Sequence, residues 1–142
     1  SYGIKTQILN SDERILNNSE VIIINSFGVL QNYYKFTKSV FIGKSIIKRL
    51  QEDSGQNPID AAKLNCKIYH GPYVSNFEEI YEILNLNGIS KEVNNFDELS
   101  ENLKVDLKEF KKEERSNLNS IKILEQDIIE KTMSHINNFL ND

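Results

Sequence analysis

A glycine turn that runs directly into a helix start is the part of this chain best suited to bind a ligand. The segment contains Ser54, Gly55, Asn57, Pro58 and Asp60. We expect Asn57 to cap the free amides of the first turn, Pro58 to occupy the first helical position, and Asp60 to complete a capping-box-like arrangement. The unpaired N–H groups could hold a phosphate, while Asp60 could accept hydrogen bonds from sugar hydroxyls. A capped helix without any ligand has the same pattern, so both interpretations stay open.

Short apolar runs alternate with helical patterns over most of the chain. Strands are predicted at residues 21–24, 40–42 and 67–69, because continuous β-branched or aromatic runs are typical of strands buried on both faces of a parallel sheet. Helices are predicted at residues 30–36, 58–64 and 77–84, and Gly88 can terminate the last of them. The alternation predicts right-handed crossovers and a doubly wound α/β fold, a Rossmann-like parallel sheet with helices on both faces.

Glycines follow each of the predicted strands. They are found at Phe27-Gly28, at Gly43 and at Gly71. Because ligands of such sheets bind at the carboxyl ends of the strands, we expect these glycines to lie together along one binding edge. Each glycine taken alone is more typical of a tight turn.

Composition limits the class of protein. A chain of 142 residues, 39% hydrophobic and 27% charged, predicts one globular domain with a core of its own. A net charge of −4 argues against a nucleic-acid-binding surface. Cys66 is the only cysteine, which excludes an internal disulfide and suits a reducing compartment. No apolar run is long enough to cross a bilayer, so we expect a soluble piece.

Apolar residues at helical spacing predict two long helices in the last third. The first covers residues 97–112, and the second follows the mixed charged run at residues 111–115. Its apolar positions are Leu118, Ile121, Leu124, Ile128, Ile136 and Leu140. We expect these helices to cover one face of the sheet; a homodimer coiled coil is the alternative, but the run is short for it.

Other motifs lack the partners that their chemistry requires. Residues 43–45 resemble the end of a P-loop, but Lys38 occupies the position of the required earlier glycine. His70 and His135 have no acidic or sulfur neighbours at ligand spacing, so no metal site is predicted. Cys66 stands at the head of a strand, where a buried and inert thiol is the expected state.

The order of the motifs resembles the carboxyl-terminal donor-binding domain of the bacterial Kdo (3-deoxy-D-manno-octulosonic-acid) transferases, which are GT-B glycosyltransferases. Those enzymes carry an Asp-Thr-Met-Gly-Glu-Leu-like segment, a Gly-Gly-Ser, a Gly-Gly-His-Asn-Pro-Leu-Glu, and a strand ending in Gly-Pro with a nearby Asn-Phe. The corresponding segments here are residues 21–30, 39–45, 54–62 and 66–77. The resemblance implies a partial carboxyl-terminal GT-B half that ends in two long helices.

The resemblance implies a set of donor-binding residues around the helix start. Gly55, Gln56 and Asn57 would face the phosphate of the nucleotide sugar CMP-Kdo, and Asp60 would accept from its ribose hydroxyls. Asp60 stands where the family usually has glutamate, one methylene longer, so a water could mediate its ribose contact.

Two further segments match the family with substitutions. Phe27, Gly28 and Val29 would lie against the nucleotide, with Val29 replacing an acid whose side-chain role is therefore lost.

Gly43 and Ser45 match two members of Gly-Gly-Ser, and Lys44 replaces the middle glycine. Lys44 could crowd the site or supply a cation for the phosphate or the Kdo carboxylate. Residues 46–53 are expected to form an extended loop, longer than in the family.

The implied reaction is transfer of Kdo from CMP-Kdo to a lipid A precursor in lipopolysaccharide biosynthesis, at the cytoplasmic face of the bacterial inner membrane. In the family an amino-terminal domain binds the lipid and supplies the catalytic carboxylate. We therefore expect this chain to be a truncated nucleotide-sugar-binding domain without that acceptor domain. It would be inactive alone, with no catalytic residue, no metal and no cofactor of its own, no nucleic-acid partner, and membrane contact only through the missing domain.

Two other functions stay open at this point. The same fold could serve a UDP-sugar or GDP-sugar transferase or a related epimerase. A non-catalytic α/β interaction module could also retain the capped helices and have no ligand.

Overall fold

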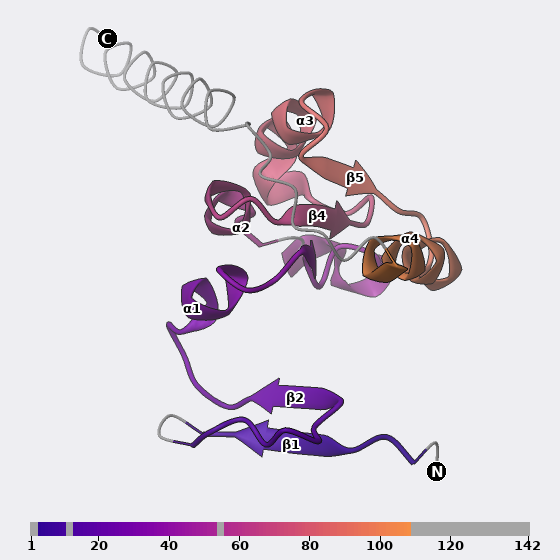
Figure 1. The fold of residues 1–142 in the computed structure, drawn as a ribbon. Coiled ribbons are helices and arrows are strands. Elements are labelled where there is room, and N and C mark those ends of the chain that lie inside the picture. Colours follow the sequence, from indigo (N-terminus) through magenta and orange to yellow (C-terminus); the bar gives the residue numbers. More distant parts are fainter. Residues whose placement is uncertain (1–2, 11–12, 54–55, 109–142) are drawn as a thin grey trace, which may run out of the picture. The chain divides into compact units, whose positions relative to one another are not determined.

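The computed structural model describes residues 3–10, 13–53 and 56–108. Two compact units divide the chain, the amino-terminal unit Ser1–Tyr33 and the carboxyl-terminal unit Tyr34–Asp142 (Figure 1). The predicted helix over residues 118–140 lies outside the described residues, as do Ser54 and Gly55. In the described ranges no helix is both long and apolar enough to span a membrane. That the whole chain is one nucleotide-sugar-binding domain stays a prediction.

Two parallel strands form the sheet of the amino-terminal unit. β1 (Thr6–Leu9) pairs with β2 (Val21–Ile24), which confirms the strand predicted at residues 21–24. The Gln7 side chain organises the connection between the strands, since its Nε2 donates to the carbonyl of Arg14 at 2.9 Å and its Oε1 accepts from the amide of Leu16 at 3.0 Å. The sequence pattern does not predict β1, which is short and polar at two of its four positions.

Within the amino-terminal unit, residues 21–24 are not buried on both faces. Val21 and Ile23 are 41% and 52% exposed, whereas Ile22 and Ile24 are half-buried. Alternating side chains of a strand point to opposite faces, and the amino-terminal unit by itself covers only one face of β2. A continuous apolar run therefore identifies a strand without showing how many of its faces are packed.

Three parallel strands form the sheet of the carboxyl-terminal unit, in the order β3-β4-β5. Their bounds are β3 (Ser39–Phe41), β4 (Lys67–His70) and β5 (Ser90–Glu92). The first two confirm the strands predicted at residues 40–42 and 67–69. β5 has the sequence Ser-Lys-Glu, so its pairing with β4 makes it a strand and its composition does not indicate one. The described strands thus form two parallel sheets, whereas the sequence pattern suggests one.

The described helices lie near the predicted positions. They are α1 (Leu30–Tyr34), α2 (Ile59–Lys63), α3 (Glu78–Leu86) and α4 (Phe96–Lys108), with the 3₁₀ helices η1 (Lys48–Asp53) and η2 (Ser75–Phe77). η1 corrects the expectation of an extended loop over residues 46–53, because the amide of Leu50 donates to the carbonyl of Ile47 at 2.9 Å and closes a turn there. Gly88, with φ +65°, follows the end of α3 as predicted.

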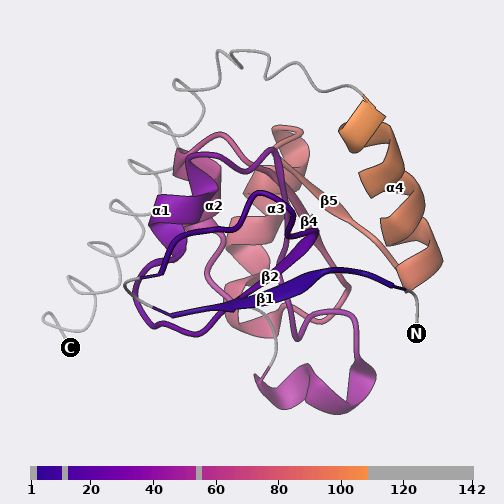
Figure 2. The ribbon, with the colours of Figure 1, turned by 60° about the horizontal axis from the view of Figure 1, so that its bottom comes forward.

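Different helices cover the two faces of the β3-β4-β5 sheet (Figure 2). Ile68 packs with α2 and α3 in the larger core cluster, whose buried members are Ile42, Ala61, Ala62, Cys66, Ile68, Val74, Tyr81, Leu84 and Ile89. Tyr69, the next residue of β4, packs on the opposite face with Val93 and with Leu99 of α4. Full burial of a side chain such as Ile68 contributes about 2 kcal/mol. Helices on both faces of a parallel sheet, as predicted, are confirmed.

Candidate functional site

The carboxyl ends of β3 and β4 lie side by side. The amide of Ile42 donates to the carbonyl of Tyr69 at 2.8 Å, immediately before the turns that begin at Gly43 and Gly71. The prediction that these two glycines share one edge of the sheet is therefore confirmed. Phe27, Gly28 and Val29 belong to the amino-terminal unit, so their place at this edge stays a prediction.

Ser45 binds the turn after β3 to the turn after β4. Its hydroxyl donates to the carbonyl of Ile42 at 2.5 Å and accepts from the amide of Gly71 at 2.9 Å, and its own carbonyl accepts from the amide of Tyr73 at 2.8 Å. Ser45 is completely buried. Its hydroxyl therefore has a structural role, and its predicted contact with a donor stays a prediction.

The close approach of the turn after β3 to the turn after β4 requires a glycine at position 71. A Cβ atom at Gly71 would lie 2.2 Å from the carbonyl oxygen of Ser45 and 2.4 Å from the Cα of Ile46. The residue thus makes room for a neighbouring chain segment. At Gly43 a Cβ would meet nothing within 4 Å, and the residue is exposed.

Lys44 lies at the exposed tip of the same turn and has a backbone φ of +61°. This left-handed region is easily reached by glycine and costs other residues roughly 1 kcal/mol. The conformation explains why a glycine suits the middle position of a Gly-Gly-Ser turn. The chain keeps that conformation here with a lysine in place of the glycine.

The helix start has the Asn57 part of the predicted cap, and the capping-box contact expected of Asp60 stays a prediction. Asn57 Oδ1 accepts from the amide of Ile59 at 2.9 Å, and Pro58 has helical angles, with φ −84°. Asp60 is exposed in the first turn of α2. Because α2 has only five residues, few peptide dipoles are aligned at its amino terminus and the attraction for a phosphate is correspondingly weak. Gly55 lies outside the described residues.

Buried aromatic side chains connect the helix start to the end of β4. The ring centroids of His70 and Tyr81 are 4.2 Å apart, and the Tyr81 hydroxyl donates to the carbonyl of Gln56 at 3.0 Å. His70 Nδ1 lies 2.8 Å from the carbonyl oxygen of Gly71, and Nε2 lies 3.3 Å from Oδ1 of Asn85. Burial raises the pKa of Tyr81 far above its ordinary value, so the hydroxyl stays a donor. The segments at Gln56 and Gly71 are thereby held in a fixed relation.

A pocket of about 420 Å³ opens next to these turns. Its lining residues are Gln51, Glu52, Pro72, Tyr73, Val74, Ser75 and Glu78. Among the described residues, no predicted donor-binding residue lines it, and Gly55 lies outside them. Glu52 and Glu78 place two carboxylates in its wall, and the lining residues that the structure describes include no lysine or arginine, so this wall disfavours an anion.

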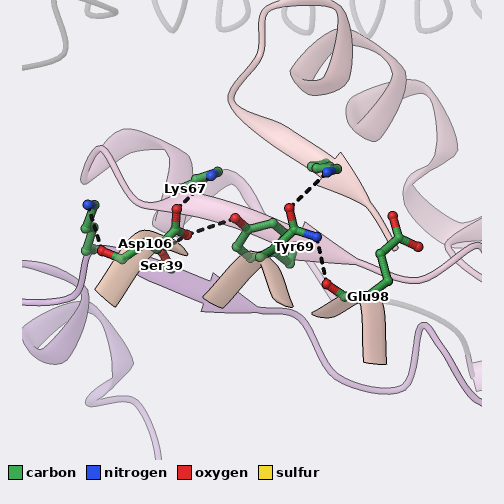
Figure 3. A network of polar contacts seen from close by, with 8 residues as sticks. Ser39, Lys67, Tyr69, Glu98 and Asp106 are labelled. Carbon is green, nitrogen blue, oxygen red and sulfur yellow. Dashed lines mark hydrogen bonds and ion pairs between the residues drawn. The ribbon is translucent and has the colours of Figure 1, made fainter. Parts of the chain in front are cut away.

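The structure also shows a polar network that the sequence pattern does not predict. Asp106 of α4 accepts hydrogen bonds from Ser39 Oγ at 2.6 Å and from the Tyr69 hydroxyl at 2.8 Å, and its other oxygen lies 2.7 Å from Lys67 Nζ (Figure 3). Burial acts to raise the pKa of Asp106, but the bonds from Lys67, Ser39 and Tyr69 outweigh it and hold the pKa below its ordinary value. One signal was available, since Asp106 falls on the apolar stripe of its helix, seven residues after Leu99.

This network joins α4 to the amino ends of β3 and β4, the opposite end of the sheet from the glycine turns. Ser39 and Lys67 are the first residues of their strands. A pocket of about 600 Å³ lies beside it, lined by Lys35, Phe36, Thr37, Lys38, Ser39, Leu103, Asp106 and Leu107. The network is thus a structural attachment of α4 to the sheet.

Cys66 is buried as expected, with its sulfur 3.4 Å from the carbonyl oxygens of Tyr34 and Thr37. Among the residues that the structure describes, no three His, Cys, Asp or Glu side chains gather in a group that could hold a metal ion.

A parallel sheet with helices on both faces and glycine turns at its carboxyl edge defines a Rossmann-like α/β domain. The same fold occurs in the crystal structure of the C-terminal CMP-Kdo binding domain of WaaA from Acinetobacter baumannii, with a TM-score of 0.68 and 20% sequence identity. The match covers 85% of this chain and 61% of that one. The resemblance predicted from the motifs is therefore confirmed for the fold. No family model matches the chain, and no curated protein matches it in sequence.

Proposed function

We propose that this chain is the CMP-Kdo-binding half of a glycosyltransferase that transfers Kdo to a lipid A precursor. The observation that carries the proposal is the likeness of fold to a CMP-Kdo binding domain over 85% of the chain, together with motifs in the family's order. The exposed carboxylate of Asp60 beside the Asn57 cap supports it, because both face solvent at a helix start.

In this proposal the nucleotide lies along the carboxyl edge of the sheet. Asp60 accepts from the ribose hydroxyls, and the backbone of Gln56 and Asn57 approaches the phosphate. Gly43 leaves open space for the nucleotide at the neighbouring turn.

The chemistry requires a second half. An acceptor domain that binds the lipid at the inner membrane would supply the carboxylate that deprotonates the acceptor hydroxyl, and CMP would leave from the site described here. The two halves would have to close around the donor for transfer to occur. We therefore expect the chain alone to bind nucleotide without catalysing transfer.

Titration of the isotope-labelled chain with CMP, followed by NMR, tests the proposal. The expected result is a set of saturable amide shifts at Gly43 and Lys44 and at the non-proline residues of the segment 56–60. UMP and GMP as competitors distinguish CMP-Kdo from the UDP-sugar and GDP-sugar alternatives. No shifts with millimolar CMP, or shifts confined to other residues, would contradict it.

A second candidate, a non-catalytic α/β module, has specific support. The Ser45 hydroxyl and the Asn57 amide oxygen are both engaged within the protein, and the pocket beside the turns carries Glu52 and Glu78. A module of this kind would bind none of the three nucleotides, so the same titration decides between the two functions.

A further inference from the structure

Lys44 is in a conformation that its residue type does not favour. Its φ is +61°, and the other non-glycine residue with positive φ among those described is Asn65, at φ +59°. Asn65 lies just past α2, where an asparagine in the left-handed region is an ordinary helix ending. Lys44 has no such local reason. Backbone strain of this kind persists where the surrounding structure enforces it and is common at functional sites.

The surrounding structure does enforce it. Ser45, the next residue, is fully buried and bonded to Ile42 and Gly71, so the base of the turn cannot relax. The Lys44 side chain is exposed at the tip. Within the described part of the chain, no carboxylate lies within ion-pair distance of it. The turn therefore presents an ammonium group at the carboxyl edge of the sheet.

An anionic ligand at this edge needs such a cation. α2 is too short to provide a strong dipole, and the neighbouring pocket presents Glu52 and Glu78. We infer that Lys44 binds the phosphate of the nucleotide. The formal charge of its side chain takes the place of the close backbone approach that a glycine would allow at this position. The inference rests on the proposed function and assigns one residue of its site.

Two substitutions of Lys44 separate the effect of its charge from the effect of its backbone conformation. Lys44→Gly removes the ammonium and relieves the backbone, so it should fold at least as well as the wild type, whereas Lys44→Gln removes the charge and keeps a long side chain. Lys104→Gln is a matched control, because Lys104 is exposed on α4 and lies 3.9 Å from a carboxylate oxygen of Glu101, which is also exposed. Affinities for CMP and for cytidine, which lacks the phosphate, are measured by calorimetry or NMR for all four proteins.

We expect Lys44→Gln to bind CMP about fivefold more weakly, the effect of losing one solvent-screened charge interaction. Lys44→Gly should also bind CMP more weakly but lose less affinity, because glycine restores the close backbone approach. Their cytidine affinity and the CMP affinity of Lys104→Gln should be unchanged. Equal CMP affinity in the wild type and both Lys44 variants would overturn the Lys44 assignment and leave the proposed function standing. Absence of CMP binding to the wild type would overturn both.

Discussion

A Cβ atom on Gly71 would lie 2.2 Å from the carbonyl oxygen of Ser45, a distance that no folded chain can accommodate without moving backbone. The same serine donates to Ile42 and accepts from the amide of Gly71. The two turns at the carboxyl edge of the sheet therefore form one rigid unit, and the residues at its tip, Gly43 and Lys44, are held where a ligand could reach them.

Gly71→Ala should destabilise the chain by about 3 kcal/mol, because overpacking against backbone cannot be relieved by a rotamer change. Gly43→Ala is the matched control, since its Cβ would meet open space, and should change stability by less than about 0.5 kcal/mol. Urea unfolding followed by circular dichroism measures both. Similar losses in the two variants would show that the approach of Ser45 to Gly71 is not tight in solution.

Lys44→Gly should raise the free energy of unfolding by about 0.5 to 1 kcal/mol, because relief of the left-handed φ exceeds the extra entropy of glycine in the unfolded chain. Asn65→Gly is the comparison, and its gain should be smaller because asparagine tolerates this conformation. Thermal unfolding at several pH values provides the measurement. A loss of stability in Lys44→Gly would mean that the lysine side chain makes stabilising contacts.

Asp60→Ala and Asn57→Ala should separate a binding site from a helix cap. Removing the cap oxygen of Asn57 should cost about 1 kcal/mol of stability. Removing the exposed carboxylate of Asp60 should cost less than about 0.5 kcal/mol in stability. The same variant should weaken CMP binding about tenfold, since a hydrogen bond to a charged group is lost. An Asp60→Ala protein that binds CMP normally would remove this residue from the proposed site.

Asp106→Asn should destabilise the chain by about 2 to 3 kcal/mol at neutral pH, because it breaks a largely buried ion pair with Lys67, whose own side chain still reaches water. Lys67→Gln tests the pair from the other side, and the double variant should lose less than the sum of the two single losses. Urea unfolding of the four proteins gives the coupling. Strict additivity would contradict a direct interaction in solution.

The pH dependence of the same pair follows from the directions of the two shifts. The folded state lowers the pKa of Asp106, so this contribution is present above the ordinary carboxyl range and is lost as the pH falls through the lowered pKa. Burial acts to lower the pKa of Lys67, but the interactions with Asp106 and Tyr69 together outweigh it and the pKa is raised, so that contribution is lost only as the pH rises through the raised value. The stability gap between wild type and Asp106→Asn should therefore be constant from about pH 5 to 9 and narrow below about pH 4. A gap that does not change below pH 4 would contradict the assignment.

Local patterns in the sequence predict most of the elements correctly. Apolar runs locate β2, β3 and β4, and Asn57 and Gly88 mark a helix start and a helix end, because capping and turn geometry depend on a few neighbouring residues. β5 was missed because Ser90, Lys91 and Glu92 have no strand pattern, and its hydrogen bonds with β4 define it.

The candidate site was also predictable from the sequence only in part. Residue types and their order were enough to place Gly43 and Gly71 after neighbouring strands and to identify Asp60 as an exposed acid at a helix start, since these are properties of short segments. Long-range packing decided that Gly71 makes room for the backbone of Ser45 and that the Ser45 hydroxyl accepts from the amide of Gly71. It also decided that Asp106 attaches α4 to the sheet. Such contacts join residues 26 to 67 positions apart, and a local pattern carries no information about which distant group will fill the space beside it.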